Sequence, residues 1–212
     1  MSKKRRTTEN LEALAEKSRL YLSAKDAARE KALRLCREII RCSANAIRAV
    51  HRQEEAKAEE LLDVARASLR KLNQDALQNH SDLLHAGFVH DAQKEFAEAS
   101  TTLAIIGRKL LPDPEALGVG YPAYLNGLGE AVGELRRYLL DSLRRNDLSR
   151  CEELLATMDD IYAVLVTMDF PEAITYGLRR TTDSVRGILE MTRGDLTLVL
   201  RQKELEDKLE QM

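Results

Sequence analysis

The sequence has no tryptophan, and aromatic residues make up only 4% of its 212 residues. Proline, with four residues, and glycine, with ten, are also scarce. Strands favour aromatic and β-branched side chains, and long irregular segments favour proline and glycine. These shortages argue against a β-rich or loop-rich protein. With 44% hydrophobic and 32% charged residues, the composition is typical of an all-α protein.

Further absences narrow the classes of function. No apolar run approaches the roughly 18 residues of a membrane span, and the charged start lacks the apolar stretch of a secretory signal. The three cysteines, Cys36, Cys42 and Cys151, follow no spacing pattern, which indicates buried free thiols in a reducing compartment. The net charge of −2 gives no global nucleic-acid signature, although local basic patches can exist. We expect a cytoplasmic protein without a membrane partner.

Helical periodicity of the apolar residues runs through almost the whole chain. It predicts helices at about 24–53, 55–78, 88–110, 123–145, from an Asn146–Ser149 turn and N-cap to about Met168, and 172–210 with interruptions at Gly187 and Gly194. The breaks fall at 79–87 and at 112–122, where three of the four prolines lie. We predict one all-α domain of about six or seven helices over residues 1–212. Residues 1–8 are expected to form a flexible basic tail.

Two glutamate pairs are candidate metal ligands: Glu95 with Glu98, and Glu130 with Glu134. Spacings of three and four residues put both carboxylates of a pair on one face of a helix. If the two helices are neighbours, four oxygen ligands converge, as a hard divalent cation requires. Spacing alone is a weak signal, because a chain with 35 acidic residues contains several such pairs. The alternative is a solvated helix face.

The residues around these acids favour a cation. Glu95 and Glu130 have no basic residue at helical spacing, so the repulsion from their acidic neighbours is not relieved within the helix. A bound cation would remove that repulsion. Against this interpretation, Lys94 and Arg137 are each within helical reach of the second acid of a pair.

Helical phase places one pair away from the apolar side of its helix. At about 100° per residue, one face carries Leu128, Val132, Leu135 and Leu139. Glu130 and Glu134 lie opposite and would face solvent in a lone monomer. A metal site therefore needs a neighbouring helix on that side or a surface enclosed by oligomerisation. Gly127, Gly129 and Gly133 in the same helix indicate close packing against another helix.

Five arginines fall within a roughly 60° arc of the first helix, and we call them the arginine row: Arg34, Arg37, Arg41, Arg48 and Arg52. Such a row can follow a phosphate backbone, because the planar guanidinium suits phosphate. The alternative is a solvated face with local ion pairs such as Glu30–Arg34. Arg137 belongs to a second group of candidate phosphate contacts, the arginines from Arg136 onward.

Other catalytic motifs are absent. The sequence contains no phosphate-binding loop, dinucleotide fingerprint, nucleophile elbow or Cys-x-x-Cys. Its four histidines form no ligand set by spacing. The lack of a Glu-x-x-His motif argues against a ferritin-like di-iron bundle.

Four segments together resemble the translin/TRAX family: 28–52, 84–99, 121–135 and 193–198. Each match is modest, but their order and spacing along the chain are specific. The resemblance implies an all-α fold of about seven helices. It also implies an oligomer, commonly an octamer, that forms a hollow particle and binds single-stranded RNA or DNA on its inner surface.

The family has a catalytic branch, whose acids bind a divalent metal and cleave RNA, and a branch that only binds nucleic acid. Glu95 and Glu98 match the Glu-x-x-Glu of the catalytic branch. Glu134 matches the acid of its Gly-Glu-Leu block, and Glu130 stands where that branch has aspartate. The resemblance therefore implies a catalytic chain. Nothing indicates a second subunit type, so a homo-oligomer is expected.

These observations predict a Mg²⁺- or Mn²⁺-dependent endoribonuclease that cuts single-stranded RNA. The metal ligands and catalytic residues are expected to be Glu95, Glu98, Glu130 and Glu134. The arginine row and Arg137 are expected to hold the strand. The first alternative is a non-catalytic, translin-like ring that binds single-stranded RNA or DNA. A further alternative is a helical adaptor whose charged faces only keep it soluble.

Overall fold

The computed structural model describes residues 8–211 and contains only helices over that range. In chain order they are α1 (Leu11–His51), α2 (Glu55–Asn79), the 3₁₀ helix η1 (Ser81–His85), α3 (Gly87–Ile106), α4 (Pro114–Leu117), α5 (Tyr121–Arg144), α6 (Cys151–Val166), α7 (Glu172–Thr175) and α8 (Leu178–Glu210). Six are long, and α4 and α7 are single turns. The predicted all-α fold class is confirmed.

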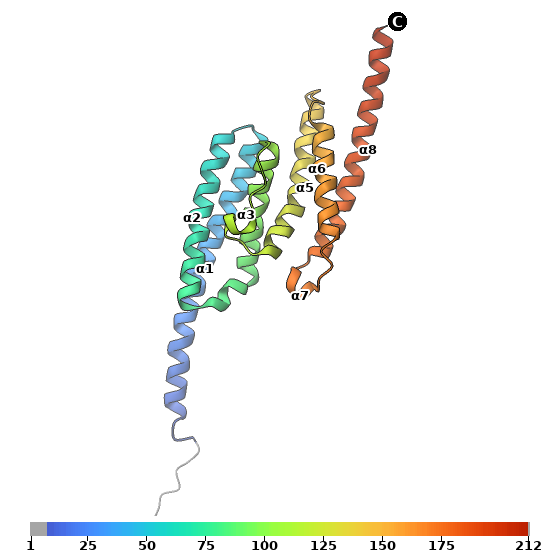
Figure 1. Ribbon diagram of the computed structural model, residues 1–212. Coiled ribbons are helices and arrows are strands. Elements are labelled where there is room, and N and C mark those ends of the chain that lie inside the picture. Colours follow the sequence, from blue (N-terminus) through green and yellow to red (C-terminus); the bar gives the residue numbers. More distant parts are fainter. Residues whose placement is uncertain (1–7, 212) are drawn as a thin grey trace, which may run out of the picture.

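The long helices form two groups that stand side by side, α1–α2–α3 and α5–α6–α8 (Figure 1). Each group has its own apolar core. Ile39, Leu69 and Phe96 are fully buried in the first core. The second core contains the whole apolar face predicted for 123–145, including Leu135 and Leu139. The groups are joined where α3 packs against α5, and we call this contact the α3–α5 seam.

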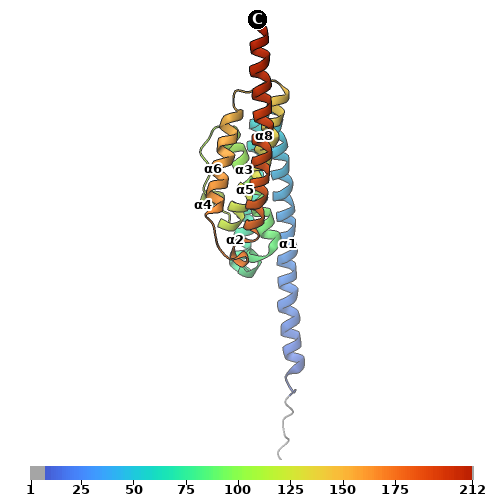
Figure 2. The same cartoon turned by 90° about the vertical axis from the view of Figure 1, so that its right-hand side faces the viewer.

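The start of α1 and the end of α8 extend beyond the bundle at opposite ends of the molecule (Figures 1 and 2). The projecting α1 turns explain one error of the sequence analysis, which began this helix at about 24. Residues 11–23 pack on no core, so they lack the buried stripe on which periodicity depends. They are rich in leucine, alanine and glutamate, whose propensity continues a helix already fixed by packing.

Two other helix boundaries were predicted wrongly. Helix α3 ends at Ile106 rather than 110, because the chain turns at Arg108, which has a left-handed φ of 54°. Leu110 is consequently 96% exposed. In contrast, α8 continues through Gly187 and Gly194 without interruption. A Cβ at either glycine would meet nothing within 4 Å, so these glycines lie on an open helix surface.

Several smaller predictions can be compared directly with the structure. The turn before α6 is present, with Asp147 accepting hydrogen bonds from Ser149, but Arg150 rather than Ser149 occupies the capping position. All three cysteines are free and buried, as predicted. In the described part of the chain, no helix is long and apolar enough to cross a membrane. Most of the predicted basic tail, residues 1–7, lies outside the described residues.

Candidate metal centre on the α3–α5 seam

Gly127 brings the backbones of α3 and α5 into contact. A Cβ on this residue would lie 2.5 Å from the carbonyl oxygen of Lys94 and 2.8 Å from the amide nitrogen of Glu98. Any larger residue would therefore push the two helices apart. The predicted close packing is confirmed here. Gly127 is one turn before Glu130, so the same close approach carries the acids of α5 toward those of α3.

Three of the four predicted ligands meet at this seam. One carboxylate oxygen from each of Glu95, Glu98 and Glu130 lies within 4.8 Å of the other two, and all three residues are partly buried. We call these residues the acidic cluster. Glu95 and Glu98 come from successive turns of one face of α3, and Glu130 faces them from α5. The arrangement offers three oxygen ligands on two rigid helices.

The fourth predicted ligand, Glu134, lies outside this group and is held by a histidine. His51, the last residue of α1, donates a hydrogen bond from Nε2 to Oε2 of Glu134 at 2.5 Å. The donor must be Nε2, because an ionised carboxylate only accepts hydrogen bonds. The His51 side chain is 6% exposed. Arg137 also approaches Glu134, at 3.8 Å.

His51 was not among the site residues predicted from the sequence. The two partners are 83 residues apart in the chain, so no helical spacing connects them. The only available signal was the position of His51 at the end of a long amphipathic helix, which does not identify its partner. A contact between α1 and α5 is set by the packing of both helices around α3.

The acidic cluster concentrates negative charge in a partly dehydrated place. Burial, together with the charges of Glu95, Glu130 and Glu134, raises the pKa of Glu98 to about 8. Burial also raises the pKa of Glu95. The opposite holds for Glu134, whose pKa is lowered by the hydrogen bond from His51. The three clustered acids are therefore short of positive charge, whereas Glu134 is satisfied.

Lys94 supplies part of that charge. Along α3 it is within helical reach of Glu98, but its Nζ lies 2.6 Å from Oε1 of Glu130, across the seam. Burial disfavours the ammonium, yet the hydrogen bond and charge of Glu130 outweigh this and raise the pKa of Lys94. One lysine faces three carboxylates. The remaining imbalance fits a hard divalent cation.

The expectation that Glu130 and Glu134 face solvent in a monomer was wrong. Their side chains are 36% and 25% exposed. The reason is that α5 is covered on two sides, by α6 and α8 on its apolar face and by α3 and the end of α1 on the other. A single chain therefore assembles the acidic cluster without a second copy.

Four arginines of the row lie on the surface of α1 and the fifth, Arg52, directly follows its last residue; all five are exposed. Arg34, Arg37 and Arg41 line an open depression with Glu38. Arg48 donates a hydrogen bond to Asn45, and Glu30 pairs with Arg29 rather than with Arg34. Arg137 is also exposed. The row is thus accessible, as a phosphate-binding surface must be.

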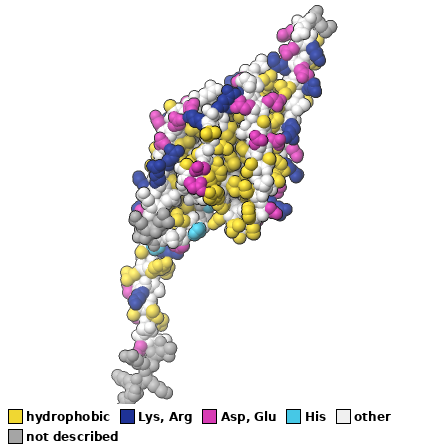
Figure 3. Space-filling model, viewed as in Figure 1, with side chains coloured by type: hydrophobic (Ala, Val, Ile, Leu, Met, Phe, Trp, Pro, Cys, Tyr) yellow, Lys and Arg dark blue, Asp and Glu magenta, His cyan; other side chains and the backbone are white. Residues whose placement is uncertain are grey.

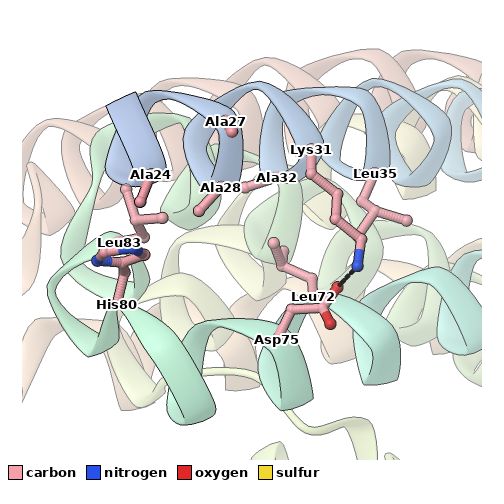
Figure 4. A pocket seen from close by; sticks show the side chains of 10 residues that line it. All are labelled: Ala24, Ala27, Ala28, Lys31, Ala32, Leu35, Leu72, Asp75, His80 and Leu83. Carbon is pink, nitrogen blue, oxygen red and sulfur yellow. Dashed lines mark ion pairs between the residues drawn. The ribbon is translucent and has the colours of Figure 1, made fainter. Parts of the chain in front are cut away.

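A separate pocket of about 350 Å³ lies between α1, α2 and η1 (Figure 4). Its lining is mostly apolar and includes Ala28, Leu35 and Leu83, with an ion pair between Lys31 and Asp75 at 2.7 Å across one end. No member of the acidic cluster reaches it. The pocket therefore offers no catalytic group to the candidate centre.

Comparison with known proteins gives consistent relatives. No family model matches the sequence. The chain is 31% identical over 194 residues to the uncharacterised protein MJ0175 of Methanocaldococcus jannaschii. The aligned region covers 91% of this chain and 85% of that protein. The crystal structure of AfC3PO has a TM-score of 0.80 and 32% identity, covering 89% of this chain and 97% of that one.

Two further structures extend the comparison. A complex of AfC3PO with duplex RNA has a TM-score of 0.70 and 31% identity, with the same coverage of 89% and 97%. Apo-NeC3PO has a TM-score of 0.73 and 18% identity, covering 92% of this chain and all of that one. The last similarity supports the fold alone, because its identity is low.

Proposed function

The chain belongs to the translin/TRAX family, as do the similar C3PO structures, and we propose that it is a Mg²⁺- or Mn²⁺-dependent endoribonuclease acting on single-stranded RNA. The observation that carries the proposal is the acidic cluster of Glu95, Glu98 and Glu130 on the α3–α5 seam. The duplex RNA bound by AfC3PO supports RNA as the class of ligand.

The donor set suits a hard cation. All three clustered ligands are carboxylates, which Mg²⁺ and Mn²⁺ prefer over nitrogen or sulfur. The raised pKa of Glu98, caused by burial and by the neighbouring carboxylates, supports a need for more positive charge than Lys94 supplies. When bound, a divalent cation supplies Lewis-acid activation of water and neutralises charge on a phosphodiester. Helices rather than loops carry the ligands, which keeps their geometry fixed.

The individual residues have distinct tasks in this proposal. Glu95, Glu98 and Glu130 hold the cation. Glu134, whose lowered pKa keeps it ionised and whose orientation is fixed by His51, stands next to the cluster as the fourth carboxylate of the centre.

The RNA strand is held by positive side chains away from the acids. The exposed arginine row presents a line of guanidinium groups along α1, and Arg137 lies two turns beyond Glu130 on α5, one turn after Glu134. Arginine pairs with phosphate in a planar, two-pronged geometry. Contacts of this kind bind the backbone without reading its sequence. Single-stranded DNA offers the same phosphate groups and is included as a ligand for binding.

We further propose that the chain works as a hollow homo-oligomer, with an octamer as the expected form. Supporting this, hydrophobic side chains gather over the middle of the molecule near α5 and α6 (Figure 3). Val164, Val166, Phe170 and Ile174 are each about half exposed or more. Exposed apolar patches of this kind mark protein–protein contacts. Multi-angle light scattering measures the number of subunits.

Cleavage of a fluorescent single-stranded RNA in Mg²⁺ tests the activity. Glu98→Gln removes one ligand charge while keeping the size of the side chain, so we expect cleavage to fall by at least about 100-fold. Chelation of the metal should abolish cleavage by the wild type. Glu206→Gln, on the exposed end of α8, is the matched control and should cut normally.

Equal cleavage by the wild type and Glu98→Gln would refute the catalytic assignment. If the wild type binds RNA but never cuts it, the protein is instead the non-catalytic single-strand-binding ring. A monomer with no salt-sensitive RNA binding would exclude both functions and leave the helical adaptor.

A further inference from the structure

Tyr176, near the acidic cluster, has an exposed side chain whose ring stacks on a histidine. It lies between α7 and α8, and its ring stacks on that of His90, with 4.3 Å between the ring centroids and 12° between the ring planes. His90 is mostly buried in the first turn of α3, one turn before Lys94. Tyr176 is 43% exposed. One face of its ring is therefore covered by His90, while the side chain remains open to solvent.

The backbone holds Tyr176 in place at a cost. Its φ of 51° and ψ of 46° are left-handed, a conformation that bulky residues rarely adopt and that persists only when the surroundings enforce it. Asn126 of α5 enforces it here. The Asn126 amide donates to the carbonyl of Thr175 at 2.9 Å and its oxygen accepts from Thr181 at 2.7 Å.

The two residues that position Tyr176, Asn126 and His90, lie on the helices that carry the acidic cluster. Asn126 is one helical turn before Glu130 on α5, and His90 is one turn before Lys94 on α3. Lys94 and Glu130 are themselves paired across the seam. The tyrosine is thus fixed to the same two helices that carry the carboxylates. The hydroxyl of Tyr176 makes no hydrogen bond within the described residues, so packing and not polar bonding sets the ring.

We propose that the open face of Tyr176 is a stacking platform for one base of a single-stranded nucleic acid whose backbone passes the acidic cluster. Aromatic rings accept any base by stacking, and single strands offer unstacked bases whereas duplexes do not. The neighbouring Arg179 and Arg180 are exposed on the first turn of α8 and are placed to contact the adjoining phosphates. The inference rests on the proposed function, since it assigns one contact of the proposed RNA ligand.

The test measures binding of a single-stranded RNA by anisotropy in Mg²⁺-free buffer, with Tyr176→Leu and Tyr176→Phe. Leucine keeps apolar bulk but cannot stack, so affinity should fall by about tenfold. Phenylalanine keeps the stack, and binding should stay within twofold of wild type. A blunt RNA duplex should bind equally to all three proteins, because its bases are already stacked.

The chain supplies a matched control in Tyr21. This tyrosine is also exposed and also contacts a histidine, His80, but edge-on at 6.1 Å and on the projecting part of α1. Tyr21→Leu should leave binding of both RNAs unchanged. A 2-aminopurine placed along the single strand should lose fluorescence on binding at one position in the wild type, and regain it with Tyr176→Leu.

The outcomes separate this inference from the proposed function. If the wild type binds the single strand and Tyr176→Leu binds it equally well, the stacking platform is wrong and the RNA-binding function stands. If Tyr176→Leu weakens single strand and duplex alike, or lowers the melting temperature as much as it lowers affinity, Tyr176 is only a packing residue. If the wild type binds no RNA, both proposals fail.

Discussion

The acidic cluster and the arginine row are both charged faces of amphipathic helices, yet they lie in different surroundings. Every arginine of the row is exposed, on α1 or directly after its last residue, and water solvates it at little cost. The acids of the cluster are partly buried between α3 and α5, and the pKa of Glu98 reaches about 8 there because of burial and like charges. An ionised side chain in water has little free-energy cost, whereas several like charges between two helices require a group of opposite charge.

The largest effect is expected from a substitution that separates α3 and α5, the two helices that carry the acidic cluster. Gly127→Ala places a Cβ 2.5 Å from the Lys94 carbonyl, so we expect a loss of about 1–3 kcal/mol in the free energy of unfolding. Urea unfolding followed by circular dichroism measures this. RNA cleavage should fall as well, since the carboxylates move apart.

Gly133→Ala is the control on the same helix. Its Cβ would meet only Ile188 Cδ1, at 3.9 Å, and alanine favours helix over glycine by up to about 1 kcal/mol. This variant should be as stable as the wild type or more so. If both substitutions change stability equally, the close approach at Gly127 does not position the site.

The charge cost of the cluster can be measured through its pH dependence in metal-free buffer. The folded pKa of Glu98, about 8, exceeds its ordinary value of 4.5, so the folded state binds more protons between these values and stability falls as pH rises through that window. Glu98→Gln removes this penalty. We expect the free energy of unfolding of this variant to exceed that of the wild type by on the order of 2 kcal/mol at pH 9. Near pH 4 the two values should be equal.

Glu134→Gln should behave in the opposite sense. The hydrogen bond from His51 lowers the pKa of Glu134, so the ionised group stabilises the fold above pH 4.5 and that contribution is lost in acid. The variant should therefore be less stable than the wild type at pH 7. Thermal melts of both variants between pH 4 and 9 test the pair, and parallel curves would contradict the assignment of opposite environments.

The sequence predicted one half of this picture well. The apolar faces of α3 and α5, the acid pairs and the exposed arginine row all follow from helical phase, which is a local property. Gly127 also indicated a close helix contact. These features were predictable because each depends on the residues of a single helix.

What failed depends on contacts between helices. Helical phase predicted that Glu130 and Glu134 face solvent in a monomer. It carries no information on the neighbouring helices, and α3 and the end of α1 cover that side of α5. For the same reason, neither the His51–Glu134 hydrogen bond nor the Lys94–Glu130 ion pair could be predicted from the sequence. The first turns of α1 were missed for the converse reason, since they pack on nothing.

The arginine row should show the smallest effects on the fold. Replacing Arg37 and Arg41 together by alanine should change stability by less than about 0.5 kcal/mol. We expect RNA affinity to fall several-fold and the slope of log K against log[salt] to decrease by about 1.4, the value for two lost phosphate contacts on a single strand.

Replacing Arg186 and Arg201 of α8, which are also exposed, is the charge-matched control. Those arginines lie on a different helix, so RNA affinity and its salt dependence should remain near the wild-type values. An equal loss from both double variants would mean that net charge, rather than the row, attracts the RNA.

Calorimetric titration of Mn²⁺ into the metal-free protein is the most direct test of the acidic cluster as a cation site. The wild type should bind Mn²⁺ saturably and release protons near pH 7.5, because Glu98 must ionise. Glu95→Gln/Glu98→Gln should lose this binding, while Glu206→Gln/Glu210→Gln, at exposed positions of α8, should keep it. Saturable binding that is unchanged in the first variant, or absent from the wild type, would contradict the assignment.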